Sequence, residues 1–561
     1  MTRKTAAFSF EDTATHQVEN QPPPFEGHNS YLEDRALVEG LKREGGAWAE
    51  PRLIDFGRTM ASAQVQKWAH DANRFLPELR SHDRFGNRVD EVDFHPSYHA
   101  LLGLAKGAAL HALPWTEKRS GAHVARVAAH MVFNKTENGI SCPIAMTFAG
   151  VPALRAQPEL ASLWEPRLIG TEYDSSFQPA KNKKSALMGM AMTEKQGGSD
   201  VRANTTRAVP IGKGGPGGEY ELTGHKWFCS APMCDAFLTL AQTEKGLSCF
   251  LVPRWLEDGT RNRFFIQRLK DKLGNLSNAS SEIEYNRTYA RMVGGEGRGV
   301  ATIIEMVHHT RLECAMGAAA IMRQAVALAF HHARYRRAFQ RKLIDQPLMR
   351  NVLADLGIEA EAATILVLRV ARGFDESATD DAAKLFTRIA TPIAKYWTCK
   401  RVTGAVYEAL ECHGGAGYVE EMMLARLYRE APLNGIWEGS GNVICLDVLR
   451  ALEREPDTAL ALLAELERAK GGDKNYDRLL ASLKDALAAK GGLEPQARRV
   501  VEQMAMALQM SLLIRHAPNY MADAFGASRL AGEYGHAYGT LPARLNIDAI
   551  VERAMPNTEA A

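Results

Sequence analysis

Hydrophobic residues follow two different periods along this chain. Across residues 31–168 they recur at three- and four-residue spacings, clearest at 61–76 and 98–113, and this spacing predicts helices. Across residues 185–285 they form short runs separated by Gly, Pro and Asn, which predicts the strands of an antiparallel sheet or barrel. From Gly299 onward the helical spacing returns, so the sheet is expected between two helical regions.

The predicted strands are short, and a glycine-rich loop joins two of them. Gly212–Gly218 contains Pro216 and precedes a strand, so we expect a hairpin loop and not the strand–loop–helix of a phosphate-binding loop. The strands are expected at residues 186–192, 219–223, 225–229, 236–241, 247–252, 264–267 and 281–285.

Long Ala- and Leu-rich patterns after the sheet predict a helical bundle followed by a helical extension. The bundle helices are expected at residues 299–339, 348–372, 381–413 and 443–452. Two later patterns end in Ala-Lys-Gly-Gly, which indicates helix ends because a glycine after lysine is a common C-terminal cap. These runs lie at 469–472 and 489–492, and further helices are expected at 494–514 and 541–554.

Strands that are segregated from helices indicate separate domains and exclude a parallel βαβ fold. Residues 1 to about 30 are polar and contain Gln21-Pro22-Pro23-Pro24, which predicts an extended arm. The expected fold class is α+β, mostly α. The predicted domains are residues 1–184 (arm and helical domain), 185–293 (β domain), 294–452 (bundle) and 453–561 (C-terminal helical extension).

The composition is typical of a soluble globular protein. Hydrophobic residues make up 46% of the 561 residues and the net charge is +2, so no global charge argues for nucleic acid or membrane. The N-terminus does not resemble a secretory signal and no apolar run approaches transmembrane length, so we expect a cytoplasmic protein that binds no membrane. Eight cysteines without a C-x-x-C motif predict reduced, packed thiols and no metal site.

Candidate chemistry gathers in the stretch Pro432–Ile444. There Glu438 follows a Trp and precedes Gly439-Ser440-Gly441-Asn442. The glycine lets backbone approach a planar ligand, Ser440 and Asn442 can bond phosphate or ribose oxygens, and an acid beside an aromatic ring suits a general base. The stretch also fits a helix N-terminus capped by Ser440 or Asn442, with Glu438 in solvent.

A second stretch, residues 190–200, reads M-A-M-T-E-K-Q-G-G-S-D. Thr193 can bond a ring nitrogen, and the loop Gly197-Gly198-Ser199 exposes backbone N–H groups to a phosphate, although an ordinary strand and turn would look the same. Further runs lie between the two stretches: G-H-K-W at 224–227, R-R-A-F at 336–339 and E-C-H-G-G-A-G-Y at 411–418.

These five ordered runs, spread over about 250 residues, resemble the acyl-CoA dehydrogenase superfamily of flavoproteins. The wording M-T-E-K-Q-G-G-S-D, the W-F-C-S segment and the long helical tail are similar to its AidB subgroup, and this resemblance covers nearly the whole chain. The resemblance implies bound FAD, a homotetramer and weak α,β-dehydrogenation of acyl-CoA. It also implies a proposed role in binding double-stranded DNA and protecting it from alkylating agents.

The resemblance also implies roles for individual residues. Glu438 falls on the general base that removes the α-proton of an acyl-CoA while the flavin takes the β-hydrogen as hydride. Arg336, Phe339 and His413–Gly415 are expected to reach the FAD of a neighbouring subunit. The implied cofactor-binding residues are Met190, Thr193, Ser199, Trp227, Phe228, Cys229, Ser230, Arg336, Phe339, His413, Gly414, Gly415, Gly439, Ser440 and Asn442.

Some positions depart from the family pattern. Glu411 and Asn442 stand where the family usually has Gln, and Cys229 where it often has Thr, which predicts inefficient turnover of acyl-CoA. Arg311 matches a substrate contact of the family. A helix-surface arginine paired with a carboxylate such as Glu305 fits Arg311 equally well.

A DNA surface has only local support in the sequence. Residues 323–350 hold seven Lys or Arg against one Asp, whereas residues 453–561 have no basic excess. Arg450 and Arg454, where the bundle meets the extension, are the candidate DNA contacts, and a solvated surface also explains them. The substrate is expected to be an acyl-CoA or a small alkylating species. The alternative function is an ordinary dehydrogenase of fatty or branched-chain acyl-CoA without a DNA role.

Overall fold

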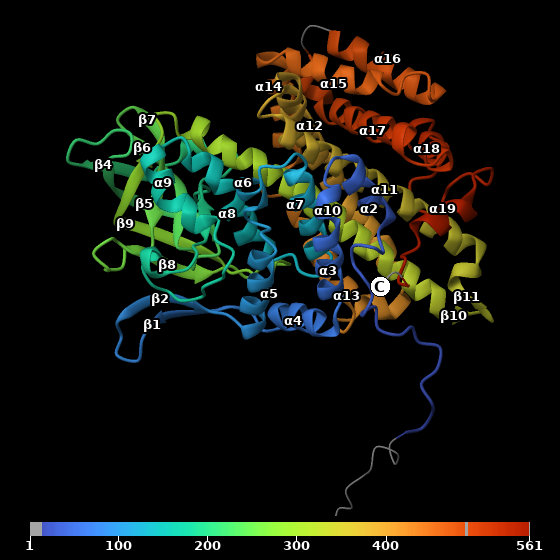
Figure 1. Cartoon of the computed structure of the whole chain (residues 1–561), viewed down its shortest axis with the longest axis horizontal. Coiled ribbons are helices and arrows are strands. Elements are labelled where there is room, and N and C mark those ends of the chain that lie inside the picture. Colours follow the sequence, from blue (N-terminus) through green and yellow to red (C-terminus); the bar gives the residue numbers. More distant parts are fainter. Residues whose placement is uncertain (1–13, 489–491, 560–561) are drawn as a thin grey trace, which may run out of the picture.

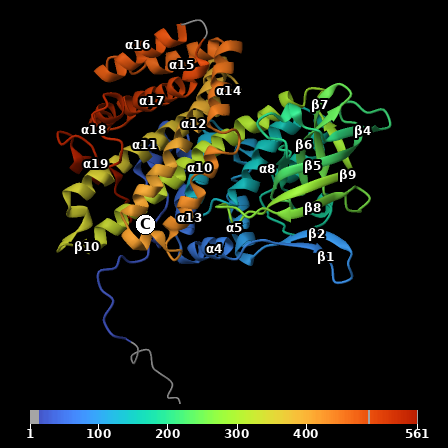
Figure 2. The ribbon, with the colours of Figure 1, turned by 180° about the vertical axis from the view of Figure 1, so that it is seen from behind.

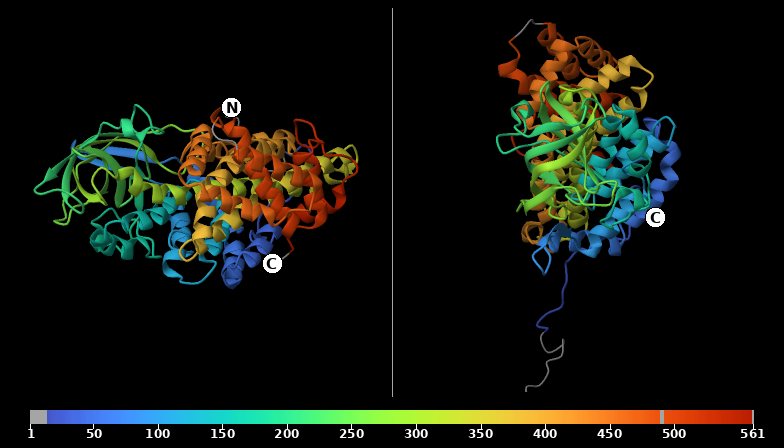
Figure 3. Two further views of the ribbon diagram at one scale, coloured as in Figure 1. Left: turned by 90° about the horizontal axis from the view of Figure 1, so that it is seen from above. Right: turned by 90° about the vertical axis from the view of Figure 1, so that its left-hand side faces the viewer.

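A sheet lies at one end of an elongated molecule that is otherwise helical (Figures 1 and 3). The computed structural model describes residues 14–488 and 492–559. Helices, then a sheet, then a bundle, then further helices follow one another along the chain, which confirms the predicted fold class. Residues 1–13 of the expected arm, and the helix end expected within 489–491, lie outside the described residues.

The N-terminal region contains the expected helices and one hairpin that the apolar pattern did not predict. The hairpin pairs β1 (Glu78–His82) with β2 (Arg88–Asp93), and most of its residues are polar and partly exposed. Asp34 caps the first of these helices by accepting a hydrogen bond from the Leu37 N–H at 3.1 Å. The helices are α2 (Arg35–Arg43), α3 (Glu50–Met60), α4 (Ala63–Arg74), α5 (Pro96–Gly107), α6 (Leu113–Thr116), α7 (Ala122–Asn134), α8 (Ser141–Leu154) and α9 (Pro158–Leu168).

The sheet is mixed and closes on itself. Its order is β3-β6-β4-β5-β9-β7, β8 pairs with β9, and β6 also pairs with β7, so the sheet forms a barrel. Because β3 and β4 run parallel to β6, the expectation of a purely antiparallel sheet was incomplete. The strands are β3 (Met188–Ala191), β4 (Arg207–Ile211), β5 (Glu219–Ser230), β6 (Ala236–Thr243), β7 (Gly246–Pro253), β8 (Phe264–Leu269) and β9 (Ser280–Val293).

Two details of the strands differ from the prediction. Residues 219–223 and 225–229 form the single strand β5, which runs through Gly224. Gly224 has a φ of +154°, and a Cβ there would lie 2.4 Å from the Thr206 hydroxyl, so the strand continues only because this residue is glycine. Strand β4 was not predicted, since most of its side chains are exposed. The loop Gly212–Gly218 joins β4 to β5 as a hairpin, as expected.

Four long helices build the bundle seen from behind in Figure 2. Helix α10 is long and apolar enough to cross a membrane by length and composition, which corrects the expectation that no apolar run has that length. However, 94% of its most apolar window is buried inside the protein, as for a core helix. The helices are α10 (Gly299–Tyr335), α11 (Pro347–Glu376), α12 (Asp381–Glu411) and α14 (Gly441–Arg454), with the short α13 (Met423–Glu430) between the last two.

Helix α10 ends at Tyr335, earlier than expected, and a small hairpin follows. The hairpin pairs β10 (Arg337–Ala338) with β11 (Arg341–Lys342). Phe339 and Gln340 form its turn with φ values of +49° and +66°, as a tight hairpin turn requires. The hairpin lies at the opposite end of the molecule from the sheet (Figure 1).

The C-terminal helices pack on the bundle through buried ion pairs. Arg369 pairs with Glu465 at 2.9 Å, and Arg553 pairs with Glu361 at 2.8 Å. Buried pairs of this kind fix how elements dock more reliably than they add stability. The helix expected at 541–554 begins only at residue 547. The helices are α15 (Asp457–Glu467), α16 (Lys474–Ala488), α17 (Ala497–His516), α18 (Asn519–Phe525) and α19 (Ile547–Ala554), and α18 continues into a π-helical turn, Gly526–Leu530.

All eight cysteines are buried and none is in a disulfide. They are spread over both helical and sheet regions of the core. Burial raises the pKa of every one of these thiols. The structure therefore agrees with the expectation of reduced, packed thiols.

Candidate active site

Glu438 lies in the turn that leads into α14, in a conformation that residues with a Cβ rarely adopt. Its φ is +59°, and left-handed backbone of this kind is concentrated at functional sites. The carboxylate Oε2 accepts a hydrogen bond from the Thr310 hydroxyl on α10 at 2.8 Å. The interpretation of Glu438 as a solvated residue is therefore wrong, although Ser440 does occupy the N-cap of α14.

Two buried cations hold the backbone on either side of this carboxylate. Arg311 donates from Nε to the Glu438 carbonyl at 3.3 Å, and Lys395 on α12 donates from Nζ to the Gly439 carbonyl. Lys395 is 1% exposed and forms no ion pair within the described residues. Both carbonyls lose these donors if the turn relaxes, so the two contacts stabilise the left-handed conformation of Glu438.

Burial raises the pKa of Glu438. The hydrogen bond from Thr310 and the positive charges of Arg311 and Lys395 act in the opposite direction, but burial outweighs them. A raised pKa makes a carboxylate a stronger base, and a base works best when its pKa lies near the operating pH. The geometry and the pKa direction together fit a proton acceptor.

Arg311 forms its ion pair with Asp447 of α14, and not with Glu305 as suggested above. Arg311 Nη1 lies 2.7 Å from Asp447 Oδ2, and Arg388 lies 3.2 Å from the same carboxylate oxygen. The carboxylate partner comes from a helix distant in sequence, so spacing within one helix could not identify it. The predicted contact of Arg311 with substrate stays a prediction.

Two motif residues near Thr193 have a structural task. Glu194 and Lys226 form a fully buried ion pair at 2.8 Å, and Glu194 also accepts from the Thr205 N–H at 2.7 Å. Burial alone would raise the pKa of Glu194, but Lys226 and its other donors bring it to about 2. The pair therefore joins the end of β3 to β5 and fixes the loop that follows Thr193.

The loop after Thr193 is held against it. The Thr193 carbonyl accepts from the Trp227 N–H at 2.8 Å, and a Cβ on Gly198 would lie 2.4 Å from the Thr193 hydroxyl, so only glycine fits there. Ser199 is exposed beside this loop. Thr193, Ser199 and Trp227 are thus brought together at one edge of the sheet domain.

In the W-F-C-S segment the aromatic side chains are at least partly exposed and the thiol is buried. Phe228 is 49% exposed, and the Lys270 ammonium lies 3.2 Å from the centre of the Trp227 ring. Cys229 is fully buried in the core of the sheet domain, where burial raises its pKa to about 12. Its side chain is buried whereas that of Phe228 is exposed, and the predicted cofactor contact of Cys229 stays a prediction.

Helix α8 packs on the sheet, since the Met190 N–H on β3 contacts the Met146 sulfur at 3.3 Å. Trp437, next to Glu438, packs against the hydrophobic cores of both the helices and the sheet. We call the predicted residues at the sheet edge and in the Glu438 turn the base-side group. It comprises Met190, Thr193, Ser199, Trp227, Phe228, Ser230, Glu438, Gly439, Ser440 and Asn442.

The remaining predicted cofactor residues form a separate, hairpin-side group: Arg336, Phe339, His413, Gly414 and Gly415. The His332 and His413 rings, 4.4 Å apart, connect the end of α10 to the end of α12. Phe339 is 92% exposed. Thr310 and Arg336 are 26 residues apart, and at 1.5 Å per helical residue this is about 39 Å, so a single chain does not bring the two groups together.

The N-terminus of α14 adds cations that the sequence motifs did not reveal. Ser440 makes no capping bond with its side chain, so its hydroxyl and the first N–H groups of α14 remain available within the described structure. A Cβ on Gly441 would lie 3.0 Å from both Arg498 and Lys400. Lys395, Lys400 and Arg498 come from α12 and α17, and nothing in their local sequence predicts this meeting.

The base-side group fits a flavin dinucleotide in its chemistry. Trp227 and Phe228 offer aromatic surface beside the hydroxyl of Thr193, and the free helix end with Ser440, Lys400 and Arg498 suits a diphosphate. The residues that would hold FAD on this side are Thr193, Ser199, Trp227, Phe228, Ser230, Ser440 and Asn442.

The candidate DNA contacts lie on the solvent side of α14. Arg450 is 53% exposed, although it lies 3.4 Å from Asp447, and Arg454 is exposed at the end of the helix. Nothing in the fold opposes their role, and they stay a prediction.

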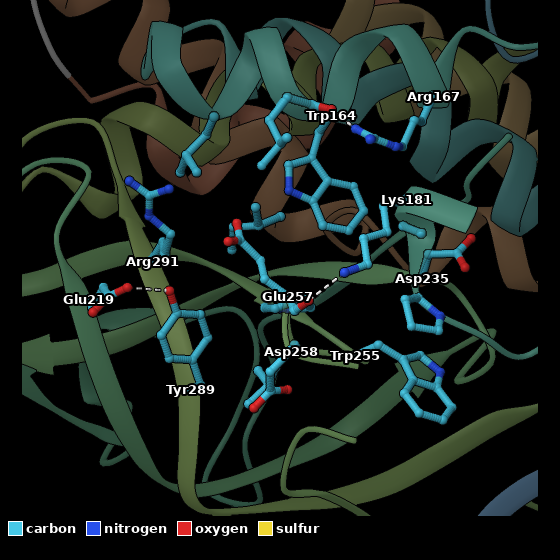
Figure 4. Close-up of a pocket in the computed structure, with 17 residues that line it drawn as sticks. Trp164, Arg167, Lys181, Glu219, Asp235, Trp255, Glu257, Asp258, Tyr289 and Arg291 are labelled. Carbon is cyan, nitrogen blue, oxygen red and sulfur yellow. Dashed lines mark hydrogen bonds between the residues drawn. The ribbon is translucent and has the colours of Figure 1, made fainter. Parts of the chain in front are cut away.

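A separate cavity of about 590 Å³ lies between α9 and the sheet (Figure 4). Trp164 and Arg167 project into it from α9, with Tyr289 and Arg291 on the strand opposite. None of the predicted cofactor or catalytic residues lines it. The redox site is therefore assigned to the base-side group and not to this cavity.

Protein families and relatives identify the family of this chain. Residues 20–175 match the adaptive response protein AidB N-terminal domain, residues 189–288 the acyl-CoA dehydrogenase middle domain, and residues 297–453 the acyl-CoA dehydrogenase C-terminal domain. The chain is 44% identical to AidB of Escherichia coli K12 over 91% of this chain and 94% of that protein. It is 31% identical to acyl-CoA dehydrogenase family member 11 of Caenorhabditis elegans, over 82% and 76% of the two chains.

Solved structures give the same result. The crystal structure of Caenorhabditis elegans ACDH-11 in complex with C11-CoA has a TM-score of 0.83 and 27% identity, covering 94% of this chain and 95% of that one. The apo form of Bd2924 has a TM-score of 0.81 and 29% identity, covering 90% and 100%. The chain therefore belongs to the acyl-CoA dehydrogenase family of oxidoreductases, in which it is an AidB-like member.

Proposed function

We propose that this chain is an FAD-dependent enzyme that removes the α-proton and the β-hydrogen of an acyl-CoA, with Glu438 as the base. The observation that carries the proposal is the Glu438 carboxylate itself. It is half-buried, accepts a hydrogen bond from Thr310, and lies in a left-handed turn whose carbonyls accept from Arg311 and Lys395. When bound, FAD supplies the acceptor for the β-hydrogen as hydride.

The side chains around Glu438 supply the rest of the chemistry. Glu438 takes the α-proton on a carboxylate oxygen, and Thr310 stabilises the charged form that is needed before this step. The thioester oxygen gains negative charge as the proton leaves, so it needs a hydrogen-bond donor. The Glu438 N–H, held in position by the Arg311 and Lys395 contacts on the neighbouring carbonyls, is the proposed donor from the protein.

An acyl-CoA is the proposed substrate class. ACDH-11, which shares the fold over nearly the whole length, was solved in complex with C11-CoA. The predicted inefficiency of turnover, drawn from Glu411, Cys229 and Asn442, applies to this activity. A small alkylating species is the other substrate that the resemblance implies. The titration with acyl-CoAs described next distinguishes the two.

The test is a titration of FAD-loaded protein with acyl-CoAs of increasing chain length while the flavin absorbance is followed. Bleaching by at least one acyl-CoA is expected. Glu438→Gln keeps the shape of the side chain but cannot take a proton, so the bleaching rate is expected to fall about 10²- to 10⁴-fold. Absence of bleaching by every acyl-CoA contradicts the proposal, and unchanged bleaching in Glu438→Gln means that another residue is the base.

We also propose a homotetramer in which each FAD lies between two subunits. The separation of the hairpin-side group from Glu438, about 39 Å along α10, supports this arrangement, as does the exposure of Phe339. Light scattering on FAD-loaded protein is expected to give four times the chain mass. A flavin-loaded monomer contradicts the proposal.

Binding of double-stranded DNA is the second proposed function. Its support is the match to the AidB N-terminal domain and the exposure of Arg450 and Arg454 on one helix. Affinity for a duplex should fall steeply with salt, and bound DNA should resist an alkylating agent. An ordinary acyl-CoA dehydrogenase shows neither property. The cytoplasm is the proposed location.

A further inference from the structure

The N-terminal arm is hydrogen-bonded to the hairpin that follows α10. Asn20 donates from Nδ2 to the Arg337 carbonyl at 2.9 Å, and its Oδ1 accepts from the Arg337 N–H at 2.7 Å. Asn20 has a φ of +56°, a conformation that asparagine tolerates better than most residues. One side chain of an exposed, polar arm thus forms hydrogen bonds with both backbone groups of Arg337.

The same turn of the arm holds the side chain of Arg336. Arg336 donates from Nη1 to the Asn20 carbonyl at 2.7 Å. No carboxylate pairs with Arg336 among residues 14–488 and 492–559, so this carbonyl is the acceptor that fixes its guanidinium in one chain. Nε and Nη2 remain available as a planar fork, the geometry that suits a diphosphate.

A second contact anchors the arm a few residues later. His331 on α10 donates from Nε2 to the Pro23 carbonyl at 2.8 Å, and Phe25 packs against the His331 ring with centroids 4.9 Å apart. Pro22, Pro23 and Pro24 restrict φ, which reduces the entropy lost when the arm docks. The arm therefore binds at both ends of its proline run, close to the hairpin.

We propose that the N-terminal arm is a positioning element for flavin binding, in which Asn20 orients Arg336 toward the FAD of a neighbouring subunit. This inference rests on the proposed function, because it takes Arg336 as a ligand of that cofactor. A tail that only covered the surface would bury its apolar side chains, whereas Val18 is 79% exposed and Asn20 bonds the residues next to the fork. Asn20 is a positioning residue and does not itself contact the flavin.

The experiment measures the affinity of full-length apoprotein for FAD by flavin fluorescence. Asn20→Ala/Phe25→Ala removes the side-chain contacts at both anchors, and the loss of affinity expected is about five- to thirtyfold. Val18→Ala, a change of the same kind on the same arm, is expected to leave the affinity unchanged. If the double variant proves unstable, Asn20→Gly takes its place. This change keeps the left-handed backbone and is expected to give a smaller loss of affinity.

Arg336→Ala separates the proposed flavin site from the proposed role of the arm. If Arg336→Ala does not weaken FAD binding, the proposed two-subunit flavin site is wrong. If it weakens binding and Asn20→Ala/Phe25→Ala does not, the positioning role of the arm is overturned. If the arm acts through Arg336, adding Asn20→Ala/Phe25→Ala to Arg336→Ala causes little further loss, whereas independent losses that add contradict the inference.

Discussion

The base-side group and the hairpin-side group occupy opposite ends of the bundle and are built in opposite ways. Around Glu438, the carboxylate and the carbonyls at 438 and 439 receive donors from α10 and α12 of the same chain. Around Phe339, the ring is 92% exposed and the Arg336 fork is held by a surface arm. The carboxylate at the first end is fixed by its own chain, while the second end has an exposed aromatic ring and a partly exposed arginine, as expected of a surface that serves another copy.

The largest effect is expected when two variant subunits are mixed. Glu438→Gln lacks the base and Arg336→Ala lacks the partner's cofactor contact, so each homotetramer is expected to be nearly inactive at limiting FAD. Random co-assembly of the two produces some sites with both native residues, and about a quarter of wild-type activity should return.

The readout is acyl-CoA-dependent flavin bleaching after joint refolding or co-expression. Two copies of Glu438→Gln bearing different tags provide the control, because their mixture contains no intact base. If the mixed variants recover no activity although mixed tetramers are isolated, both groups act within one chain and the division drawn above is wrong.

Lys395→Met tests the base side alone. The change leaves the Gly439 carbonyl without its buried donor and removes a positive charge that lowers the pKa of Glu438. We expect about a tenfold or greater loss of kcat, since small displacements of a base are costly. We also expect the acid limb of the pH–rate profile to move to higher pH.

Lys384→Met is the matched control, because Lys384 is exposed on the same helix, α12. Equal losses in the two variants would assign the effect to the stability of α12. A loss in kcat without a change in the pH profile would mean that Lys395 supports the fold but not the base.

Thr310→Val should have a moderate and specific effect. Burial raises the pKa of Glu438 and the Thr310 hydrogen bond lowers it, so removing the hydroxyl raises the pKa further. Activity is then lost on the acidic side, where the base becomes protonated, and recovers as pH rises above the new pKa. Thr310→Ser keeps the donor and is expected to retain the wild-type profile; a shifted profile for Ser would mean that packing, not the hydrogen bond, sets the pKa.

Arg454→Glu is expected to have the smallest effect, about three- to tenfold on affinity for duplex DNA, with a lower salt slope. Arg454 forms no ion pair within the described residues, unlike Arg450, whose reversal would disturb Asp447 and through it Arg311. Arg74→Glu makes the same charge change on the distant helix α4. Equal losses for both would indicate nonspecific charge attraction in place of a contact at the end of α14.

The sequence predicted the order of regions and most strands and helices, because long stretches keep a single apolar period. It missed β1, β2 and β4, whose partly exposed residues carry little periodic signal. It also extended α10 beyond Tyr335, since Arg337–Phe339 suits a helix until the left-handed turn at Phe339 and Gln340 is known.

Within the candidate site, the sequence singled out Glu438, Thr193 and Trp227 but could not predict what surrounds them. Motif residues that look alike in the sequence differ in the structure. Glu194 and Lys226 form a buried ion pair that stabilises the fold, and the side chain of Cys229 is buried in the core. Lys395 and Arg498 reach the site from helices far along the chain. Contacts of that kind depend on how helices dock, which no local pattern encodes.

Because all eight cysteines are buried, the thiols of the folded chain react slowly with electrophiles. A thiolate, not a thiol, attacks an alkylating reagent, and here burial both blocks access and raises every thiol pKa. A maleimide or iodoacetamide should therefore label the protein only as fast as its regions open. The eight thiols, spread through helices and sheet, thus serve as built-in reporters of local unfolding, with each labelled position marking the part of the fold that opened first.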